Sequence, residues 1–178
     1  LGGGMVSGSL TLIGGDPGVG KSTLLLMVAG RLAERGLPVL YASGEESAQQ
    51  VQLRAQRLGI HSEKLFLLPT AQFEDIEDAA KSIQPVLIIV DSVQTVSVSD
   101  ITSHAGSVSQ VRAVAHQAMV FAKQNHMATI LVGHITKSGD LAGPKILEHF
   151  VDAVLYFEGD GRTSLRALRT VKNRFGAA

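Results

Sequence analysis

The sequence contains no cysteine, and aromatic residues make up only 4% of its 178 positions. The lack of cysteine excludes disulfides and thiolate metal sites within this chain, and it suits a reducing compartment. Hydrophobic residues nevertheless reach 45%, so the core must be built from Val, Ile, Leu and Ala. That composition is typical of a buried parallel sheet covered by helices.

Neither sign of charge dominates, and long apolar runs are also missing. The formal net charge is zero, so any contact with nucleic acid must be local rather than driven by a global basic field.

The longest apolar runs, such as Val86–Val90, are too short to cross a bilayer, and no charged-then-apolar leader opens the chain. We therefore expect a cytoplasmic protein with no membrane partner. Because the chain begins at Leu1 rather than Met, we interpret it as one domain, residues 1–178, of a longer protein.

Apolar runs typical of strands alternate along nearly the whole chain with segments in which apolar residues have helical spacing. The expected strands are Ser9–Gly14, Pro38–Ser43, Leu65–Leu68, Val86–Asp91, Ala128–Val132, Ala153–Glu158 and Ser164–Lys172. Four of the expected helices are Lys21–Arg35, Phe73–Gln84, Ser107–Gln124 and Lys145–Phe150. A further helix is expected to begin with a capping box at Ser43-Gly44-Glu45-Glu46 and to run to about Leu58. This order predicts an α/β fold with a mostly parallel central sheet and helices on both faces. The last two expected strands form an antiparallel hairpin that turns at Asp160-Gly161.

A glycine-rich motif follows the first expected strand and fits G-x-x-x-x-G-K-[ST] in full. Glycines let several backbone N–H groups point at phosphate oxygens, and the following helix N-terminus favours an anion. The lysine can reach the β- and γ-phosphates, and the serine hydroxyl is placed to ligate Mg²⁺. A glycine-rich turn with an incidental lysine is the alternative. The motif predicts a site for Mg²⁺ and ATP, formed by Gly15, Asp16, Pro17, Gly18, Val19, Gly20, Lys21, Ser22 and Thr23.

Two carboxylates are candidates for the rest of an ATPase site. Asp91 ends the run Val86–Val90, at the edge where ligands of open α/β sheets bind, and is the expected second magnesium ligand. An aspartate that caps the turn after a strand is the alternative. Glu45 follows the second strand and is the candidate base for water, since the capping box uses only Glu46. Two solvated acids in the first turn of a helix would give the same pattern.

Further polar residues follow the fifth and last expected strands. His134 comes just after Ala128–Val132, where it can face the γ-phosphate, although a histidine here is more often structural. Four cations of the last strand fall on even positions and would share one face, opposite Leu165, Ala167 and Val171. A solvated basic sheet edge, or cations presented to a neighbouring subunit's nucleotide, would both explain them. These cations are Arg162, Arg166, Lys172 and Arg174.

Taken in order, these motifs resemble the ATPase core of the bacterial RadA (Sms) recombination and repair family, which is related to RecA and to replicative hexameric helicases. The resemblance spans nearly the whole chain. Besides the glycine-rich motif, it rests on Leu1-Gly2-Gly3-Gly4 with Gly8-Ser9, Ser43-Gly44-Glu45-Glu46-Ser47, Asp91-Ser92-Val93-Gln94-Thr95, Gly133-His134-Ile135-Thr136-Lys137, Leu141-Ala142-Gly143-Pro144-Lys145 and Lys172-Asn173-Arg174-Phe175-Gly176.

The resemblance implies a RecA-like fold and a DNA-dependent, helicase-type ATPase that promotes branch migration in homologous recombination. It further implies a hexameric ring, single-stranded DNA and branched recombination intermediates as partners, and a recombinase partner. By similarity, Glu45 would be the catalytic glutamate and His134 the nucleotide sensor. Lys172 and Arg174 would reach the adjacent subunit's ATP. The loops Ser97–Ser107 and Ser138–Lys145 would face DNA, with Lys137 and Lys145 as phosphate contacts.

The chain departs from the family pattern in two respects. Family members carry a four-cysteine zinc module before this core and a Lon-protease-like domain after it, and neither is present in the sequence. We interpret the chain as the excised core. Three alternatives to the motor remain: a nucleotide-binding ring scaffold with little turnover, a small-molecule P-loop kinase, and another RecA-like ATPase of the circadian-clock or helicase-loader type.

Overall fold

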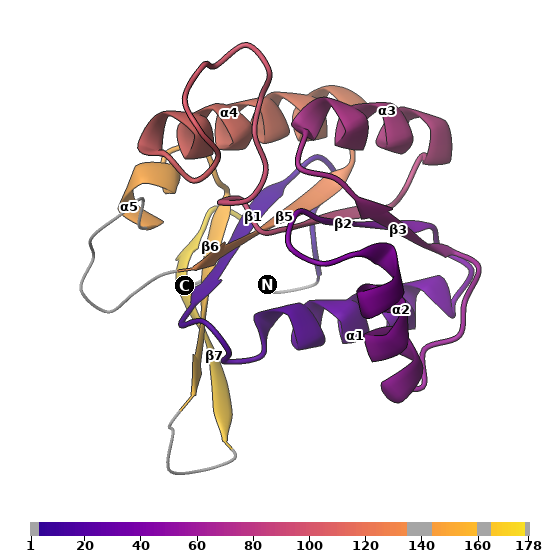
Figure 1. Ribbon diagram of the computed structural model, residues 1–178. Coiled ribbons are helices and arrows are strands. Elements are labelled where there is room, and N and C mark those ends of the chain that lie inside the picture. The colour runs from indigo at the N-terminus through magenta and orange to yellow at the C-terminus, as the bar shows by residue number, and fades with distance from the viewer. Residues whose placement is uncertain (1–3, 135–143, 160–164, 177–178) are drawn as a thin grey trace.

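The computed structural model describes residues 4–134, 144–159 and 165–176. Its centre is a seven-stranded sheet in the order β3-β2-β4-β5-β1-β6-β7 (Figure 1). Every strand pair is parallel except β6 with β7. The strands are β1 (Leu10–Gly15), β2 (Val39–Ser43), β3 (Leu65–Pro69), β4 (Leu87–Asp91), β5 (Ala128–His134), β6 (Ala153–Gly159) and β7 (Arg166–Asn173).

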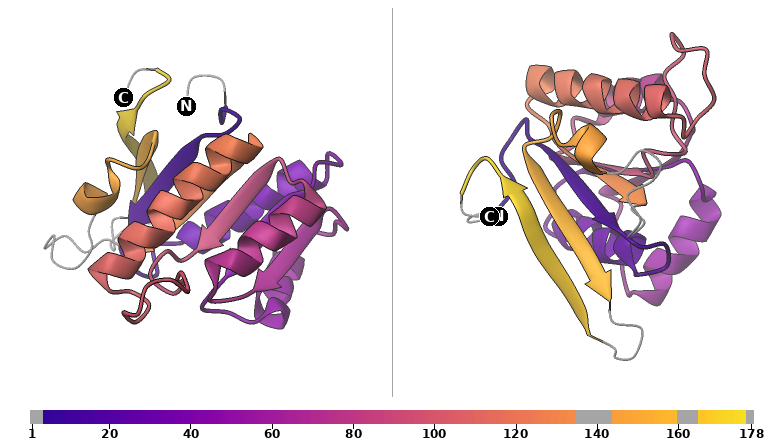
Figure 2. Two further views of the ribbon diagram at one scale, coloured as in Figure 1. Left: turned by 90° about the horizontal axis from the view of Figure 1, so that it is seen from above. Right: turned by 90° about the vertical axis from the view of Figure 1, so that its left-hand side faces the viewer.

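Helices cover both faces of the sheet (Figure 2). One face carries α1 (Lys21–Ala33) and α2 (Ala48–Arg57). The other carries α3 (Phe73–Ile83), α4 (Val108–Asn125) and the short α5 (Pro144–Leu147). The predicted α/β class, with a mostly parallel sheet and a terminal antiparallel hairpin, is therefore confirmed.

The central strands are apolar throughout because both of their faces are covered. In β4, Leu87 and Ile89 pack with α1 on one face, while Ile88 and Val90 pack with α4 on the other. Successive side chains of a strand point to opposite faces, so an unbroken apolar run is needed when neither face meets water. This packing fixes the register of the sheet.

That register brings the carboxyl ends of four strands to one edge. Gly15 of β1 lies opposite His134 of β5, and Ser43 of β2 lies opposite Asp91 of β4. The segments that follow these strands carry the glycine-rich motif and Glu45, so the candidate nucleotide site lies at this edge.

The predicted start of the second helix is wrong. α2 begins at Ala48, and its capping box is formed by Ser47 and Gln50. The Oγ of Ser43 does accept a hydrogen bond from the N–H of Glu46, at 3.0 Å, but Ser43 is an extended residue of β2. The spacing of a capping box occurs twice within eight residues here, and the second occurrence starts the helix.

The predicted shared face of the C-terminal cations is also wrong. The register between β6 and β7 shifts between Val154 and Leu155, which face Lys172 and Thr170. A bulge of this kind interrupts the alternation of side chains, so Lys172 lies on the α4 face of the hairpin while Arg166 lies on the α1 face. Arg162 and the turn at Asp160-Gly161 lie outside the described residues.

The remaining elements agree with the sequence apart from their ends. β5 extends to His134 rather than ending at Val132, so the histidine belongs to the strand itself. None of the helices among the described residues has the length and apolar character needed to span a membrane.

Candidate nucleotide-binding site

The loop between β1 and α1 has the backbone that a phosphate cradle requires. Gly18 and Gly20 have φ values of 76° and 106°, in the region that side chains rarely adopt. A Cβ on Gly15 would lie 2.2 Å from the carbonyl oxygen of Phe157, so only glycine fits against β6. The loop leads into α1 at Lys21, and its end therefore carries the N–H groups of a helix N-terminus.

Lys21 is folded back across this loop and is 4% exposed. Its ammonium donates hydrogen bonds to the carbonyl oxygens of Gly15, at 2.8 Å, and of Asp16, at 3.0 Å. Burial lowers the pKa of Lys21, while the charges of Asp91, Asp16 and Glu45 oppose that shift. The cation is thus held at the sheet edge by neutral acceptors that a phosphate can replace.

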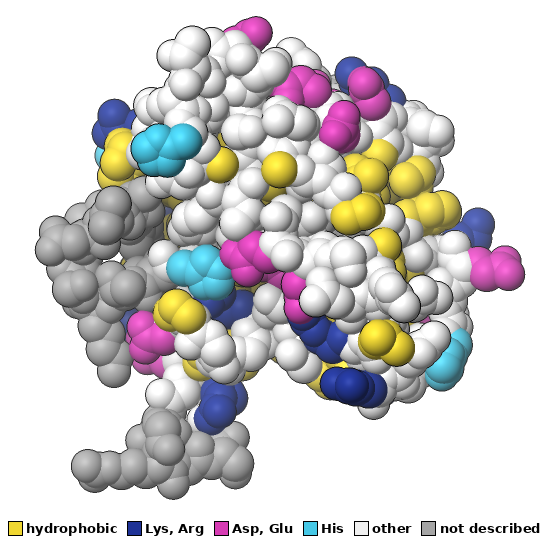
Figure 3. Space-filling view, viewed as in Figure 1, with side chains coloured by type: hydrophobic (Ala, Val, Ile, Leu, Met, Phe, Trp, Pro, Cys, Tyr) yellow, Lys and Arg dark blue, Asp and Glu magenta, His cyan; other side chains and the backbone are white. Residues whose placement is uncertain are grey.

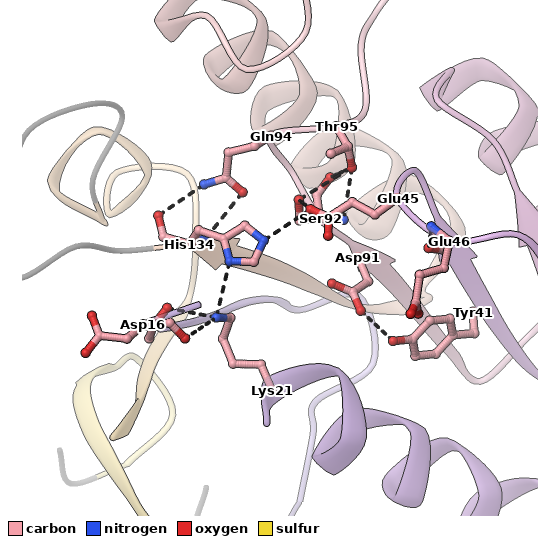
Figure 4. Close-up of polar contacts among 12 residues, drawn as sticks. Asp16, Lys21, Tyr41, Glu45, Glu46, Asp91, Ser92, Gln94, Thr95 and His134 are labelled. Carbon is pink, nitrogen blue, oxygen red and sulfur yellow. Dashed lines mark hydrogen bonds and ion pairs between the residues drawn. The ribbon is translucent and has the colours of Figure 1, made fainter. Parts of the chain in front are cut away.

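His134 connects this lysine to the candidate base. Its Nδ1 lies 3.4 Å from Lys21 Nζ, and its Nε2 lies 3.1 Å from Glu45 Oε1 (Figure 4). An imidazole that donates through Nε2 to the carboxylate keeps Nδ1 free to accept from the ammonium. Three residues from three separate motifs therefore form one hydrogen-bonded chain.

Glu45 is also held by Ser92, whose hydroxyl donates to Oε1 at 2.9 Å. The glutamate side chain remains 43% exposed, which leaves it accessible to a water molecule. The neighbouring Glu46 pairs instead with Arg54 of α2. The two adjacent glutamates are therefore separated: Glu45 lies with His134 at the candidate site, and Glu46 contacts the following helix.

Asp91 lies at the end of β4 and is 6% exposed. Its Oδ2 accepts a hydrogen bond of 2.6 Å from the hydroxyl of Tyr41, a residue of β2. Burial, together with the adjacent Asp91 charge, raises the pKa of Tyr41 strongly, so the phenol stays protonated and acts as a donor.

Mg²⁺ suits this arrangement. The described residues contain no cluster of three or more side chains able to hold a metal by themselves. Mg²⁺ in nucleotide sites is held by one or two protein oxygens together with phosphates. The buried carboxylate of Asp91 and the Ser22 hydroxyl in the first turn of α1 supply that limited donor set.

Gln94 links this site to the loop that follows β4. Its side-chain amide pairs with the backbone of His134, donating to the carbonyl at 3.3 Å and accepting from the N–H at 3.4 Å. Sequence reasoning missed Gln94, Ser92 and Tyr41 as parts of the site. Ser92 and Gln94 lie within three residues of Asp91, which was an available signal, whereas Tyr41 gave none beyond a hydroxyl in an apolar strand.

Lys172 and Arg174 lie at the opposite edge of the sheet. Lys172 Nζ donates to the carbonyl oxygens of Glu148 and of Val151, the latter at 2.8 Å. Arg174 pairs with Asp152 at 3.1 Å, and the same carboxylate accepts from the N–H of Leu10, the first residue of β1. The structure thus keeps these two cations together and away from the chain's own glycine-rich loop. Arg174 is level with the start of β1, about 16 Å along the strand from that loop, and Lys172 lies on β7, two strands from β1.

The expected DNA-facing loop at 97–107 is ordered by a buried amide. Gln110 is 1% exposed, and its side chain bonds the backbone of Val98, Ile101 and Ser103. The loop contains no lysine or arginine, and acidic side chains gather over neighbouring α3 (Figure 3). Lys137 lies outside the described residues, as does the side chain of Lys145, so neither expected phosphate contact is placed.

The sequence is also similar to known proteins. The model of a protein family described as an AAA domain matches residues 1–140. Three bacterial proteins named DNA repair protein RadA are similar over 99% of this chain. The identities are 53% in Chlamydia muridarum, 55% in Streptococcus pyogenes serotype M3 and 54% in Halalkalibacterium halodurans. The chain spans 39% of the length of each of these relatives.

Proposed function

The chain belongs to the AAA domain family, and from this premise we propose that it is the ATP-hydrolysing core of a DNA repair protein, driven by Mg²⁺-ATP and coupled to DNA. The resemblance to the ATPase core of the RadA family is confirmed by the identities of 53–55%. One structural observation carries the proposal: Lys21, His134 and Glu45, from three different motifs, form one hydrogen-bonded chain at the sheet edge.

In the proposed reaction the glycine-rich loop and Lys21 bind the phosphates of ATP. Ser22 and Asp91 would hold Mg²⁺, which would neutralise charge on the phosphates. Lys21 exchanges the carbonyl oxygens of Gly15 and Asp16 for phosphate oxygens, and this positions the γ-phosphoryl group at the exposed side of Glu45. Glu45 then accepts a proton from the water whose oxygen attacks the γ-phosphorus, and ADP leaves as the bond between that phosphorus and its bridging oxygen breaks.

His134 is suited to report the state of the nucleotide. It contacts both Lys21 and Glu45, and its backbone is paired with Gln94 at the start of the loop after β4. When Lys21 turns toward a γ-phosphate, the imidazole loses the partner of its Nδ1. We propose that this change is passed through Gln94 to the loop Ser97–Ser107, which would face DNA.

The placement of Lys172 and Arg174 supports a role in a neighbouring subunit. Arg174 lies about 16 Å along the sheet from the chain's own glycine-rich loop, and Lys172 bonds to the segment before β6, so we propose that both act on the nucleotide of a second protomer. In the proposed hexameric ring they would leave Glu148 and Asp152 and contact the ATP of the next subunit. The zinc module and the Lon-protease-like domain of the family would flank this core in the whole protein.

Branch migration, single-stranded DNA, branched intermediates, a recombinase partner and a cytoplasmic location belong to the proposal for the whole protein. Lys137 and Lys145 remain the proposed phosphate contacts. The competing function is a scaffold that binds ATP to close a ring with little turnover. Glu45 argues against it, because a pure binder needs no base exposed beside its lysine.

The test is steady-state ATP hydrolysis with and without single-stranded DNA at low salt, with Lys21→Ala as the blank. A DNA-coupled motor should show turnover that rises with DNA, vanishes in the variant and weakens as salt is added. Turnover that DNA does not change would refute coupling by this domain and leave the ATPase intact. ATP binding without turnover would favour the scaffold.

A further inference from the structure

Tyr41 carries a hydroxyl into the middle of β2, a strand whose residues are all buried. It lies in β2 between Leu40 and Ala42 and is 1% exposed. Its ring packs in the apolar cluster of the α1 face, with Ile89 of β4 as its register partner. A phenylalanine would fill the same volume, so packing alone does not account for the hydroxyl.

That hydroxyl is aimed at Asp91. It donates to Oδ2 at 2.6 Å, the short distance of a bond to an ionised carboxylate. Asp91 itself is 6% exposed, so little water competes for this oxygen. The second oxygen points away from Tyr41, toward the side on which Lys21 lies (Figure 4). The tyrosine therefore distinguishes two otherwise equivalent carboxylate oxygens.

Other charges near Tyr41 are already engaged. Glu46 and Arg54 lie close enough to act on the phenol electrostatically, but they pair with each other. Lys21, on the other side of Asp91, is bound to the carbonyl oxygens of the glycine-rich loop. Among the described side-chain contacts, the bond from Tyr41 is the one that sets the orientation of the Asp91 carboxylate.

We propose that Tyr41 is a positioning residue for the magnesium ligand Asp91: its hydroxyl holds Oδ2 and leaves Oδ1 to serve the metal. The inference rests on the proposed Mg²⁺-ATP site. Partners that orient a ligating carboxylate typically change metal affinity about 10- to 100-fold when removed. A merely structural hydroxyl would change stability and leave the dependence on Mg²⁺ unaltered.

The first experiment compares Tyr41→Phe with the native chain by titrating Mg²⁺ into a complex with a fluorescent, non-hydrolysable ATP analogue. The variant should need about tenfold more Mg²⁺ for half-maximal signal, while its affinity for the analogue in EDTA stays the same. Tyr156→Phe is the matched control, since it removes the hydroxyl of the chain's other tyrosine, in β6. It should behave like the native chain.

A double-mutant cycle with Asp91→Asn tests whether Tyr41 acts through the aspartate. Once Asp91 is changed, Tyr41→Phe should cause no further shift in the Mg²⁺ titration. If Tyr41→Phe caused an equal shift with and without Asp91→Asn, the proposal would be overturned. It would also be overturned if Tyr41→Phe alone kept the native dependence on Mg²⁺. If the native chain showed no Mg²⁺-dependent nucleotide binding at all, the proposed function itself would fail.

Tyrosine fluorescence gives a second test, in which the hydroxyl of Tyr41 is kept. The chain has no tryptophan, so in the Tyr156→Phe background Tyr41 is its sole emitter. A carboxylate acceptor quenches tyrosine emission, so adding Asp91→Asn should raise it. With the pair intact, Mg²⁺ and nucleotide should leave the emission low, because the bond persists when the metal is held. A rise on metal binding would show that Tyr41 releases Asp91 and would contradict the proposal.

Discussion

At the scale of single residues, the candidate site depends on which of two adjacent glutamates faces the nucleotide. Glu45 accepts from Ser92 and contacts His134, both at the edge where parallel strands end. Glu46 contacts Arg54 and takes no part in that chain. The two adjacent carboxylates thus have different partners because the backbone turns between β2 and α2.

This division predicts opposite outcomes for two conservative substitutions. Glu45→Gln should lower the rate of ATP hydrolysis by about 10²–10⁴-fold, since an amide cannot take a proton from water. ATP binding should be kept, because Lys21 and the glycine-rich loop are unchanged. Glu46→Gln, measured in the same phosphate-release assay, should retain activity within a few-fold. Equal losses in the two variants would contradict the assignment of Glu45 as the base.

At the scale of elements, the start of α2 decides how the segment after β2 is held. Ser47 and Gln50 bond each other's backbone N–H groups, at 3.3 and 2.9 Å, and satisfy two donors of the first turn. This cap fixes the start of α2 two residues after Glu46, so the loop that carries Glu45 is short.

Removal of this cap should be measurable. Ser47→Ala should lower the free energy of unfolding by about 1 kcal/mol in urea denaturation. Ser82→Ala, at an exposed position inside α3, serves as the control and should have almost no effect, because alanine is the better helix former. A loss at Ser82 as large as that at Ser47 would contradict the cap.

The same element shows how far the sequence alone could go. The strands could be predicted because runs such as Leu87–Val90 are apolar and buried on both faces, and the glycine-rich motif carries its own chemistry. The start of α2 could not, since two capping-box spacings compete and the first is excluded by the pairing of Ser43 with β3 and β4. The bulge in β7 and the contact of Tyr41 with Asp91 depend on register between strands, which single-sequence patterns do not specify.

At the scale of the whole molecule, the sheet separates two sets of cations. Lys21 lies at the carboxyl edge, in the candidate nucleotide site, while Lys172 and Arg174 bond to Val151 and Asp152, which precede β6. An interface that brings the amino edge of one protomer to the carboxyl edge of the next would unite them. Such an interface is head-to-tail, the kind that closes into rings.

Nucleotide binding should also stabilise the whole fold. At a concentration 100 times its Kd, a ligand bound by the folded state adds about 2.7 kcal/mol of stability. For a domain of this size each kcal/mol raises the Tm by about 2–4 °C, so Mg²⁺-ATP should raise it by about 5–10 °C. Thermal denaturation with and without the nucleotide measures this shift. The same shift in Lys21→Ala would mean that binding occurs elsewhere.

The most direct test of the account is phosphate release from ATP in Mg²⁺ by the native chain and by Lys21→Ala, prepared identically. We expect sustained turnover by the native chain and release at the buffer background by the variant. Equal release in both preparations, or none from a native chain that binds ATP, would contradict hydrolysis at the edge where Lys21, His134, Glu45 and Asp91 meet.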